Sequence, residues 1–256
     1  MSALLLALER KDRGFLYLET HAGRGAYALE NSPEGRARAL SIERVLASAQ
    51  AHPELAAYAR SVAAWRAHRG DARAYPGSPL LAASQLRSQD RAVFIELLPD
   101  EAGALRAALP PDARTQVVEA DGFERLRAFL PPPERRALTF IDPPYEETQR
   151  DFARTEETAR AALRRFQTGV IAVWYPIKDA RDTETWHAGL RARLASAVLV
   201  GELWRHPCDS RVALNGSGML IVNPPYRTAE RMREWLPALY ALLDPARAGG
   251  TSVRVW

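Results

Sequence analysis

The chain reads Leu138-Thr-Phe-Ile-Asp-Pro-Pro-Tyr145 near its middle, where an apolar run passes directly into an acidic, proline-rich turn. A continuous apolar run bounded by Asp and Pro is typical of a strand that is buried on both faces of a sheet. Helical patterns lie on either side of it, at Phe123–Leu130 and Glu156–Phe166. A strand between two such helices predicts βαβ units and a parallel sheet.

Six further apolar runs have the same character, and another helical pattern, Glu101–Leu109, separates two of them. The runs are Phe15–Thr20, Ala92–Glu96, Thr115–Glu119, Val170–Tyr175, Ser196–Trp204 and Gly218–Val222. No long helical pattern separates the last two runs, so we expect them to form an antiparallel pair at one side. The seven runs predict an α/β fold with an open, doubly wound, mostly parallel, Rossmann-like sheet.

The interval between the first two runs is too long for a simple crossover. It spans about seventy residues, whereas a crossover usually needs about a dozen or somewhat more. Two helical patterns, 34–50 and 53–68, predict a helical subdomain inserted at 33–75 within a single domain of residues 1–256. The insert carries a net charge of +3 out of the chain's +4. A nucleic-acid surface or an ordinary solvated helix face would explain this charge.

Composition excludes several classes of protein. Apolar residues make up 47% and charged residues 26%, which excludes a disordered chain or a coiled coil. The single Cys208 excludes a disulfide framework, and no histidine pair has helical metal-ligand spacing, so we expect no metal. The early apolar run Ala3–Leu8 is too short for a signal peptide or a membrane span. We therefore expect a cytoplasmic protein with no membrane partner, and a monomer.

The turn Asp142-Pro143-Pro144-Tyr145 carries the strongest chemical signal. An exocyclic base amine is a poor nucleophile because its lone pair is delocalised into the ring. A carboxylate that accepts one N–H, with the Pro143 carbonyl accepting the other, would draw that lone pair out of conjugation, and the prolines would fix the carbonyl. The Tyr145 ring would stack on the flipped base. The alternative is a rigid turn with a capping Asp.

A second copy of the motif, Asn223-Pro-Pro-Tyr226, follows the last run. Ligands bind outside the carboxyl ends of parallel strands, where the strand order reverses. The strands that begin at Phe15 and Leu138 flank that point in a sheet of this type. An antiparallel last strand ends at the opposite edge, so we interpret the second copy as a structural turn.

Three strand ends carry residues suited to a cofactor. The loop after the first run contains His21 and Gly23, where glycine lets a ligand approach the backbone, although a plain strand-to-helix turn explains it equally well. Glu96 ends the second run and could accept ribose hydroxyls, unless it is a surface acid. Asp121-Gly122 follows the third run and could accept from an adenine amine, or serve as a helix N-cap and turn.

Ser78 and Pro79 favour a helix start, with Ser78 as the N-cap and Pro79 in the first position. From these residues alone, a structural role for Ser78 is the favoured interpretation.

Seven segments of the chain follow one pattern in one order: Phe15–Gly25, Tyr75–Pro79, Ile95-Glu96, Glu119–Gly122, Ile141–Tyr145, Trp174–Pro176 and Ser217–Met219. Together they resemble the bacterial RlmJ family of 23S ribosomal RNA adenine-N6 methyltransferases. The resemblance runs from about residue 4 to the C-terminus and implies a class I methyltransferase fold and S-adenosyl-L-methionine as cofactor. It implies cofactor contacts at His21, Ser78, Glu96, Asp121 and Gly122, with Asp142 as the catalytic acceptor and Tyr145 as the stacking residue. We also expect Gly23 and Asp142 to contact the cofactor, and Pro143 to lie at the reacting amine.

The chain departs from the family pattern at its start. Members begin with a stretch rich in His, Asn and Lys before the first helix, whereas this chain opens at Met1-Ser-Ala-Leu-Leu-Leu6, inside that helix. Glu19 stands where the family usually has Asp. Two alternatives accompany methylation of 23S ribosomal RNA. One is a DNA adenine-N6 methyltransferase, because the Asp-Pro-Pro-Tyr motif does not distinguish ribose from deoxyribose, and the other is a catalytically inactive RNA-binding protein that lacks the family's N-terminal segment.

Overall fold

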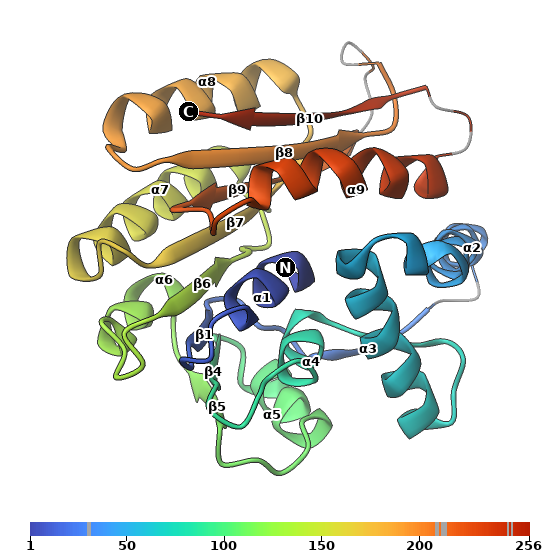
Figure 1. The fold of residues 1–256 in the computed structure, drawn as a ribbon, viewed down its shortest axis with the longest axis horizontal. Coiled ribbons are helices and arrows are strands. Elements are labelled where there is room, and N and C mark those ends of the chain that lie inside the picture. Colours follow the sequence, from blue (N-terminus) through green and yellow to red (C-terminus); the bar gives the residue numbers. More distant parts are fainter. Residues whose placement is uncertain (30–31, 208–209, 211–213, 245, 247) are drawn as a thin grey trace.

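The structure is a computed structural model that describes residues 1–29, 32–207, 210, 214–244, 246 and 248–256. Within these ranges the main feature is an eight-stranded sheet with the order β10-β8-β9-β7-β6-β1-β4-β5 (Figure 1). Its strands are β1 Leu16–Glu19, β4 Arg91–Glu96, β5 Thr115–Glu119, β6 Ala137–Ile141, β7 Val170–Ile177, β8 Val198–Trp204, β9 Gly216–Val222 and β10 Gly250–Val255. The predicted α/β class is confirmed.

The strand directions also match the prediction. β1 pairs in parallel with β4 on one side and β6 on the other, and β5 and β7 extend the parallel part of the sheet. β9 runs antiparallel to both β7 and β8. The strand order therefore reverses beside β1, and β9 ends at the edge where β6 and β7 begin.

Helices cover both faces of the sheet, because the side chains of each buried strand alternate between two cores. Leu16 and Leu18 of β1 face one core, and Tyr17 faces the other. The first core contains residues of α6 Gly122–Arg125 with the following 3₁₀ turn η2 Leu126–Phe129, α7 Thr148–Arg165 and α8 Ala180–Arg193. The second contains residues of α1 Ser2–Glu9, α4 Ser78–Ala83, α5 Pro99–Ala108 and α9 Thr228–Leu243.

The prediction of seven strands was too low. β10 adds an edge strand antiparallel to β8, and a separate hairpin pairs β2 Ala26–Ala28 with β3 Ala74–Pro76. β10 reads Gly-Thr-Ser-Val-Arg-Val and lies at the half-exposed edge, so it has no continuous apolar run to reveal it. β2 and β3 are three residues each, which is too short for a periodic pattern.

The two predicted helices of the insert are present as α2 Pro33–Ser48 and α3 Pro53–Arg69, joined by the 3₁₀ turn η1 Ala49–Ala51. The Ser32 hydroxyl accepts from the Gly35 N–H and caps α2, and Gly70, with φ of 61°, ends α3. Both helices pack on α9, where Glu54 forms an ion pair with Arg231. That they form a separate subdomain stays a prediction.

Within the described ranges, each helix is too short or too polar to cross a membrane. In the same ranges, no three His, Cys, Asp or Glu side chains are grouped so that they could hold a metal ion. Cys208 lies outside the described residues.

Candidate active site

Four of the parallel strands end, at one edge of the sheet, in or just before a residue or loop that the sequence singled out. β1 leads into His21 and Gly23, β4 ends at Glu96, β5 leads to Asp121, and β6 leads to Asp142. Since β1 lies between β4 and β6, these residues surround the point where the strand order reverses. This is where ligands bind in open α/β sheets.

Glu96 holds two loops in place at this edge. Its Oε2 accepts a hydrogen bond from the Gly23 N–H at 2.7 Å, and its Oε1 accepts from the Leu98 N–H at 2.9 Å. Gly23 has a φ of 61°, a left-handed conformation that favours glycine. Each carboxylate oxygen has further acceptor capacity, so Glu96 could orient the loop and bind a hydroxyl group at the same time.

Asp121 is an N-cap, as one of its two interpretations required, and it is also ion-paired. Its carboxylate accepts from the Phe123 N–H and from Arg154, each at 2.8 Å. Partial burial opposes ionisation, but these two hydrogen bonds hold the pKa of Asp121 below its usual value. The carboxylate is therefore ionised at neutral pH. A Cβ on Gly122 would lie 1.8 Å from the Thr20 carbonyl oxygen, so glycine is required there.

His21 lies against the same helix start and is neutral. Burial lowers the pKa of His21 to about 4. Its Nδ1 lies 2.8 Å from the Thr20 hydroxyl, and its ring packs edge-on against Phe123 with the centroids 4.5 Å apart. A neutral, fixed imidazole can contribute shape and a hydrogen bond to this site, but no charge.

The structure shows that the prediction of Ser78 as a helix N-cap was wrong. The N-cap of α4 is Gly77, and Ser78 is the first residue of the helix. Its hydroxyl instead donates to Glu19 Oε1 at 2.5 Å. Burial, with the nearby Asp142 carboxyl, raises the pKa of Glu19 well above its usual value. Because Glu19 ends β1, this hydrogen bond connects α4 to the edge of the sheet that carries Asp142.

Asp142 is only partly exposed, and among the described residues its carboxyl has no hydrogen-bond partner. Burial raises the pKa of Asp142 to about 7. The Pro143 carbonyl likewise accepts no hydrogen bond within the described part of the chain. Two acceptors on a proline-braced loop are thus left without partners at the ligand-binding edge of the sheet. This arrangement is suited to holding a group with two N–H donors.

Known proteins resemble the chain over nearly its whole length. The family model described as "Ribosomal RNA large subunit methyltransferase D, RlmJ" matches residues 12–256. The chain is 37% identical over 254 residues to Ribosomal RNA large subunit methyltransferase J of Escherichia coli, covering 98% of this chain and 90% of that protein. The protein of that name from Haemophilus influenzae is 35% identical over 255 residues, with the same coverage. The chain belongs to the RlmJ family.

A solved structure agrees with this assignment to the RlmJ family. The Legionella pneumophila protein LPL1258 superposes with a TM-score of 0.84 at 32% sequence identity. The match covers 100% of this chain and 92% of that one. The likeness therefore includes the edge of the sheet that carries the candidate site.

The structure does not place Tyr145, predicted as the stacking residue of this RlmJ family member, where it could stack on a base. Its side chain is 1% exposed, and its hydroxyl donates to the Trp174 carbonyl at 2.6 Å. Phe152 and Trp174 pack against its ring. Stacking would require the loop to move, because neighbouring side chains cover the ring. As placed, Tyr145 anchors the Asp142 loop to β7.

The second copy of the motif lies away from this site, as the topology predicted. Asn223 follows β9, and its side-chain amide donates to the carbonyls of Gln167 and Gly169, just before β7 begins. This is the edge opposite to Asp142. Tyr226 is 86% exposed and has no part in the candidate site. The interpretation of Asn223 as part of a structural turn is confirmed.

Sequence reasoning missed two residues that fix the site. Lys178 Nζ donates to the Tyr145 carbonyl at 2.8 Å and to the Thr148 hydroxyl at 3.0 Å, which ties the Asp142 loop to the end of β7. Arg154 holds Asp121 and lies over the Phe123 ring, 4.2 Å from its centroid. The rarity of lysine, with two in the whole chain, is a weak signal for the first. Arg154 had no comparable signal among 33 arginines.

Proposed function

We propose that this protein transfers a methyl group from S-adenosyl-L-methionine to the N6 amine of an adenine in 23S ribosomal RNA. One observation carries the proposal. The Asp142 carboxyl and the Pro143 carbonyl, neither with a partner among the described residues, lie on a rigid loop beside the point where the strand order reverses. Membership in the RlmJ family supports ribosomal RNA as the substrate.

The residues present fit the proposed cofactor. S-adenosylmethionine supplies an electrophilic methyl group on a positively charged sulfur, and its ribose hydroxyls, adenine amine and ammonium group are hydrogen-bond donors. The site offers carboxylate acceptors at successive strand ends, with Glu96 suited to the ribose and Asp121 to the adenine amine. The loop at His21 and Gly23 would line the cofactor, and Ser78, held by Glu19, would lie beside it.

Asp142 and Pro143 would activate the target amine. With one N–H donated to the carboxylate and the other to the carbonyl, the nitrogen lone pair turns out of conjugation with the ring. Lys178 and Tyr145 keep the loop in position by bonding it to β7. Positioned acceptors of this kind typically contribute about 10²–10⁴ in rate. A substrate in the large ribosomal subunit would place the protein in the cytoplasm.

Product analysis tests this proposal against both alternatives. The protein is incubated with methyl-labelled S-adenosylmethionine and, separately, 23S ribosomal RNA transcribed in vitro, 16S ribosomal RNA and unmethylated genomic DNA. The products are digested to nucleosides and separated. We expect label in N6-methyladenosine from 23S ribosomal RNA alone. Label in DNA would establish the DNA methyltransferase instead, and cofactor binding without label in any substrate would establish the inactive binding protein.

A further inference from the structure

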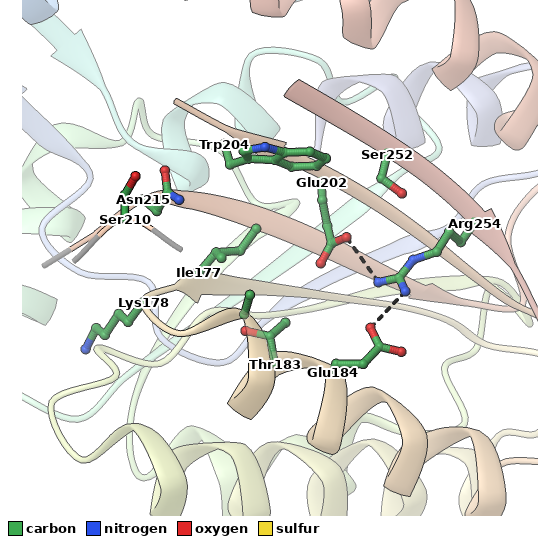
Figure 2. Close-up of a pocket in the computed structure, with 11 residues that line it drawn as sticks. Ile177, Lys178, Thr183, Glu184, Glu202, Trp204, Ser210, Asn215, Ser252 and Arg254 are labelled. Carbon is green, nitrogen blue, oxygen red and sulfur yellow. Dashed lines mark hydrogen bonds and ion pairs between the residues drawn. The ribbon is translucent and has the colours of Figure 1, made fainter. Parts of the chain in front are cut away.

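A hollow lies at the same edge of the sheet as Asp142. It has a volume of about 240 Å³ and lies between the end of β7, the start of α8, and strands β8 and β10 (Figure 2). Its walls include Ile177, Lys178, Glu202, Trp204, Ser252 and Arg254. None of these residues belongs to the predicted cofactor site.

The hollow, here called the β7–β10 pocket, is next to the Asp142 loop. β7 pairs with β6 so that Val173 lies opposite Ile141, and continuing this register places Trp174 beside Asp142. Ile177 lies three residues further, or about 10 Å along the strand. Lys178 links the two places directly, because it lines the pocket and donates to the Tyr145 carbonyl.

One wall of the pocket is a flat aromatic ring. Trp204 ends β8 and pairs with Gly250 of β10. A Cβ at Gly250 would lie 2.9 Å from the indole, so the absent side chain allows the ring to lie against the bare backbone of β10. The indole therefore packs on protein while it also lines the pocket. Such a ring can stack on a planar ligand.

The polar groups of the pocket are fixed, and their charges cancel. Arg254 is held between Glu184 at 2.9 Å and Glu202 at 3.1 Å, and Glu202 also accepts from the Tyr175 hydroxyl. The Ser252 hydroxyl has no partner among the described residues. With Lys178, the pocket has two cations and two carboxylates. This balance does not favour a phosphate, and it suits a neutral planar group with hydrogen-bonding edges.

We propose that the β7–β10 pocket binds a base of the substrate RNA, from a nucleotide that flanks the target adenine, with Trp204 stacking on it. This inference rests on the proposed function and extends it to substrate selection. The base of an unpaired nucleotide next to the one held by Asp142 would lie further along β7, at the end of that strand, where the pocket is. The pocket would help to choose the RNA sequence around the methylated position.

Abasic scanning tests the proposal. The methylated adenosine is first located by assigning the label to fragments of 23S ribosomal RNA. RNA fragments that carry it are then made with one abasic nucleotide at each flanking position in turn, and their binding is measured by fluorescence anisotropy at fixed salt. Removing the base at one flanking position should weaken binding to the unmodified protein about 5- to 150-fold, the range for stacking on an aromatic side chain. Trp204→Ala should abolish this sensitivity, and Trp204→Phe, which keeps an aromatic face, should retain most of it.

A second variant guards against misfolding of Trp204→Ala. Ser252→Phe fills the pocket while Trp204 stays in place, and it should also remove the sensitivity to the abasic nucleotide. Cofactor affinity and thermal unfolding confirm that each variant is folded. If an abasic nucleotide weakened binding equally in both folded variants and in the unmodified protein, the pocket assignment would be overturned. It would also be overturned if no abasic nucleotide at any flanking position weakened binding to the unmodified protein. Absence of methylation by the unmodified protein would instead overturn the proposed function.

Discussion

Ionisation of the Asp142 carboxyl controls how strongly it accepts an N–H and whether it can take up a proton. Burial raises its pKa to about 7, so in the cofactor-free protein about half the molecules carry the neutral acid near neutral pH. A neutral carboxylic acid is the weaker acceptor, and it cannot take up a proton. A positively charged cofactor nearby would favour the carboxylate and lower this pKa.

Methyl transfer should therefore increase with pH through an apparent pKa near 7, as measured by kcat/KM for S-adenosylmethionine. With the cofactor bound, the corresponding pKa of kcat should be lower. Asp142→Asn keeps an oxygen acceptor but cannot ionise, so its rate should be lower and nearly constant between pH 6 and 8. The same pH profile in Asp142→Asn would show that another group titrates.

The place of a residue in the fold could be predicted from the sequence where strand direction determines it. It could not be predicted where it depends on a hydrogen bond to a residue far away in the sequence. The assignment of Asp142 and Asn223 to opposite edges followed from strand direction alone. Ser78 was wrongly predicted as an N-cap because a local pattern cannot show Glu19, its hydrogen-bond partner 59 residues away. The pattern Asp-Pro-Pro-Tyr shows an aromatic residue, but it does not show that Tyr145 is buried.

At the scale of helices, strands and loops, the conformation of the loop between β6 and α7 depends on its attachment to β7. Tyr145 has a φ of 54°, which is unusual for a side chain of its size. Its hydroxyl and carbonyl both bond to β7 or to the residue that follows it. These contacts hold a strained turn in one conformation, and that turn sets the position of the Pro143 carbonyl.

Tyr145→Phe separates anchoring from stacking. It keeps the ring and removes the hydrogen bond to the Trp174 carbonyl. If Tyr145 is an anchor, the free energy of unfolding should fall by about 1 kcal/mol, since a part-buried hydrogen bond is lost, and the single-turnover rate should fall. Urea unfolding and rapid-quench kinetics measure the two effects. A variant as stable and as active as the unmodified protein would support stacking instead.

The strands buried on both faces were predictable because their apolar runs are continuous, as in β4 and β6. β10 was not, because only its pairing with β8 makes it a strand. This matters for the site, because β10 contributes Ser252 and Arg254 to the pocket beside the Asp142 loop. The strand that the sequence did not reveal is thus also one wall of a candidate binding surface.

Across the whole molecule, positive charge is concentrated on the insert at 33–75. Arg38 and Arg60 are exposed on α2 and α3, and both lack an ion-pair partner among the described residues. The helices of the insert could be predicted because the interval between the first two apolar runs is too long for a crossover and contains two helical patterns. Their packing on α9 could not be predicted, because it depends on contacts with residues near the C-terminus such as Arg231.

If the insert contacts RNA, the double variant Arg38→Glu/Arg60→Glu should bind 23S ribosomal RNA more weakly. The slope of log affinity against log salt should also become shallower by about 1 to 2, because each phosphate contact contributes about 0.7–0.9. Arg164→Glu, at the exposed end of α7 away from the site, is the matched control and should leave the slope unchanged. Equal slopes in all three proteins would make the insert's charge an ordinary solvated surface.

The most direct test compares the two copies of the motif in one assay. Asp142→Ala and Asn223→Gly, the latter compatible with a φ of 53°, are assayed for single-turnover methylation of 23S ribosomal RNA, with cofactor affinity measured in parallel. We predict that Asp142→Ala loses at least about 10²-fold in rate and still binds S-adenosylmethionine, while Asn223→Gly methylates at the rate of the unmodified protein. Near-normal transfer by Asp142→Ala, or loss of transfer in a folded Asn223→Gly, would contradict the account.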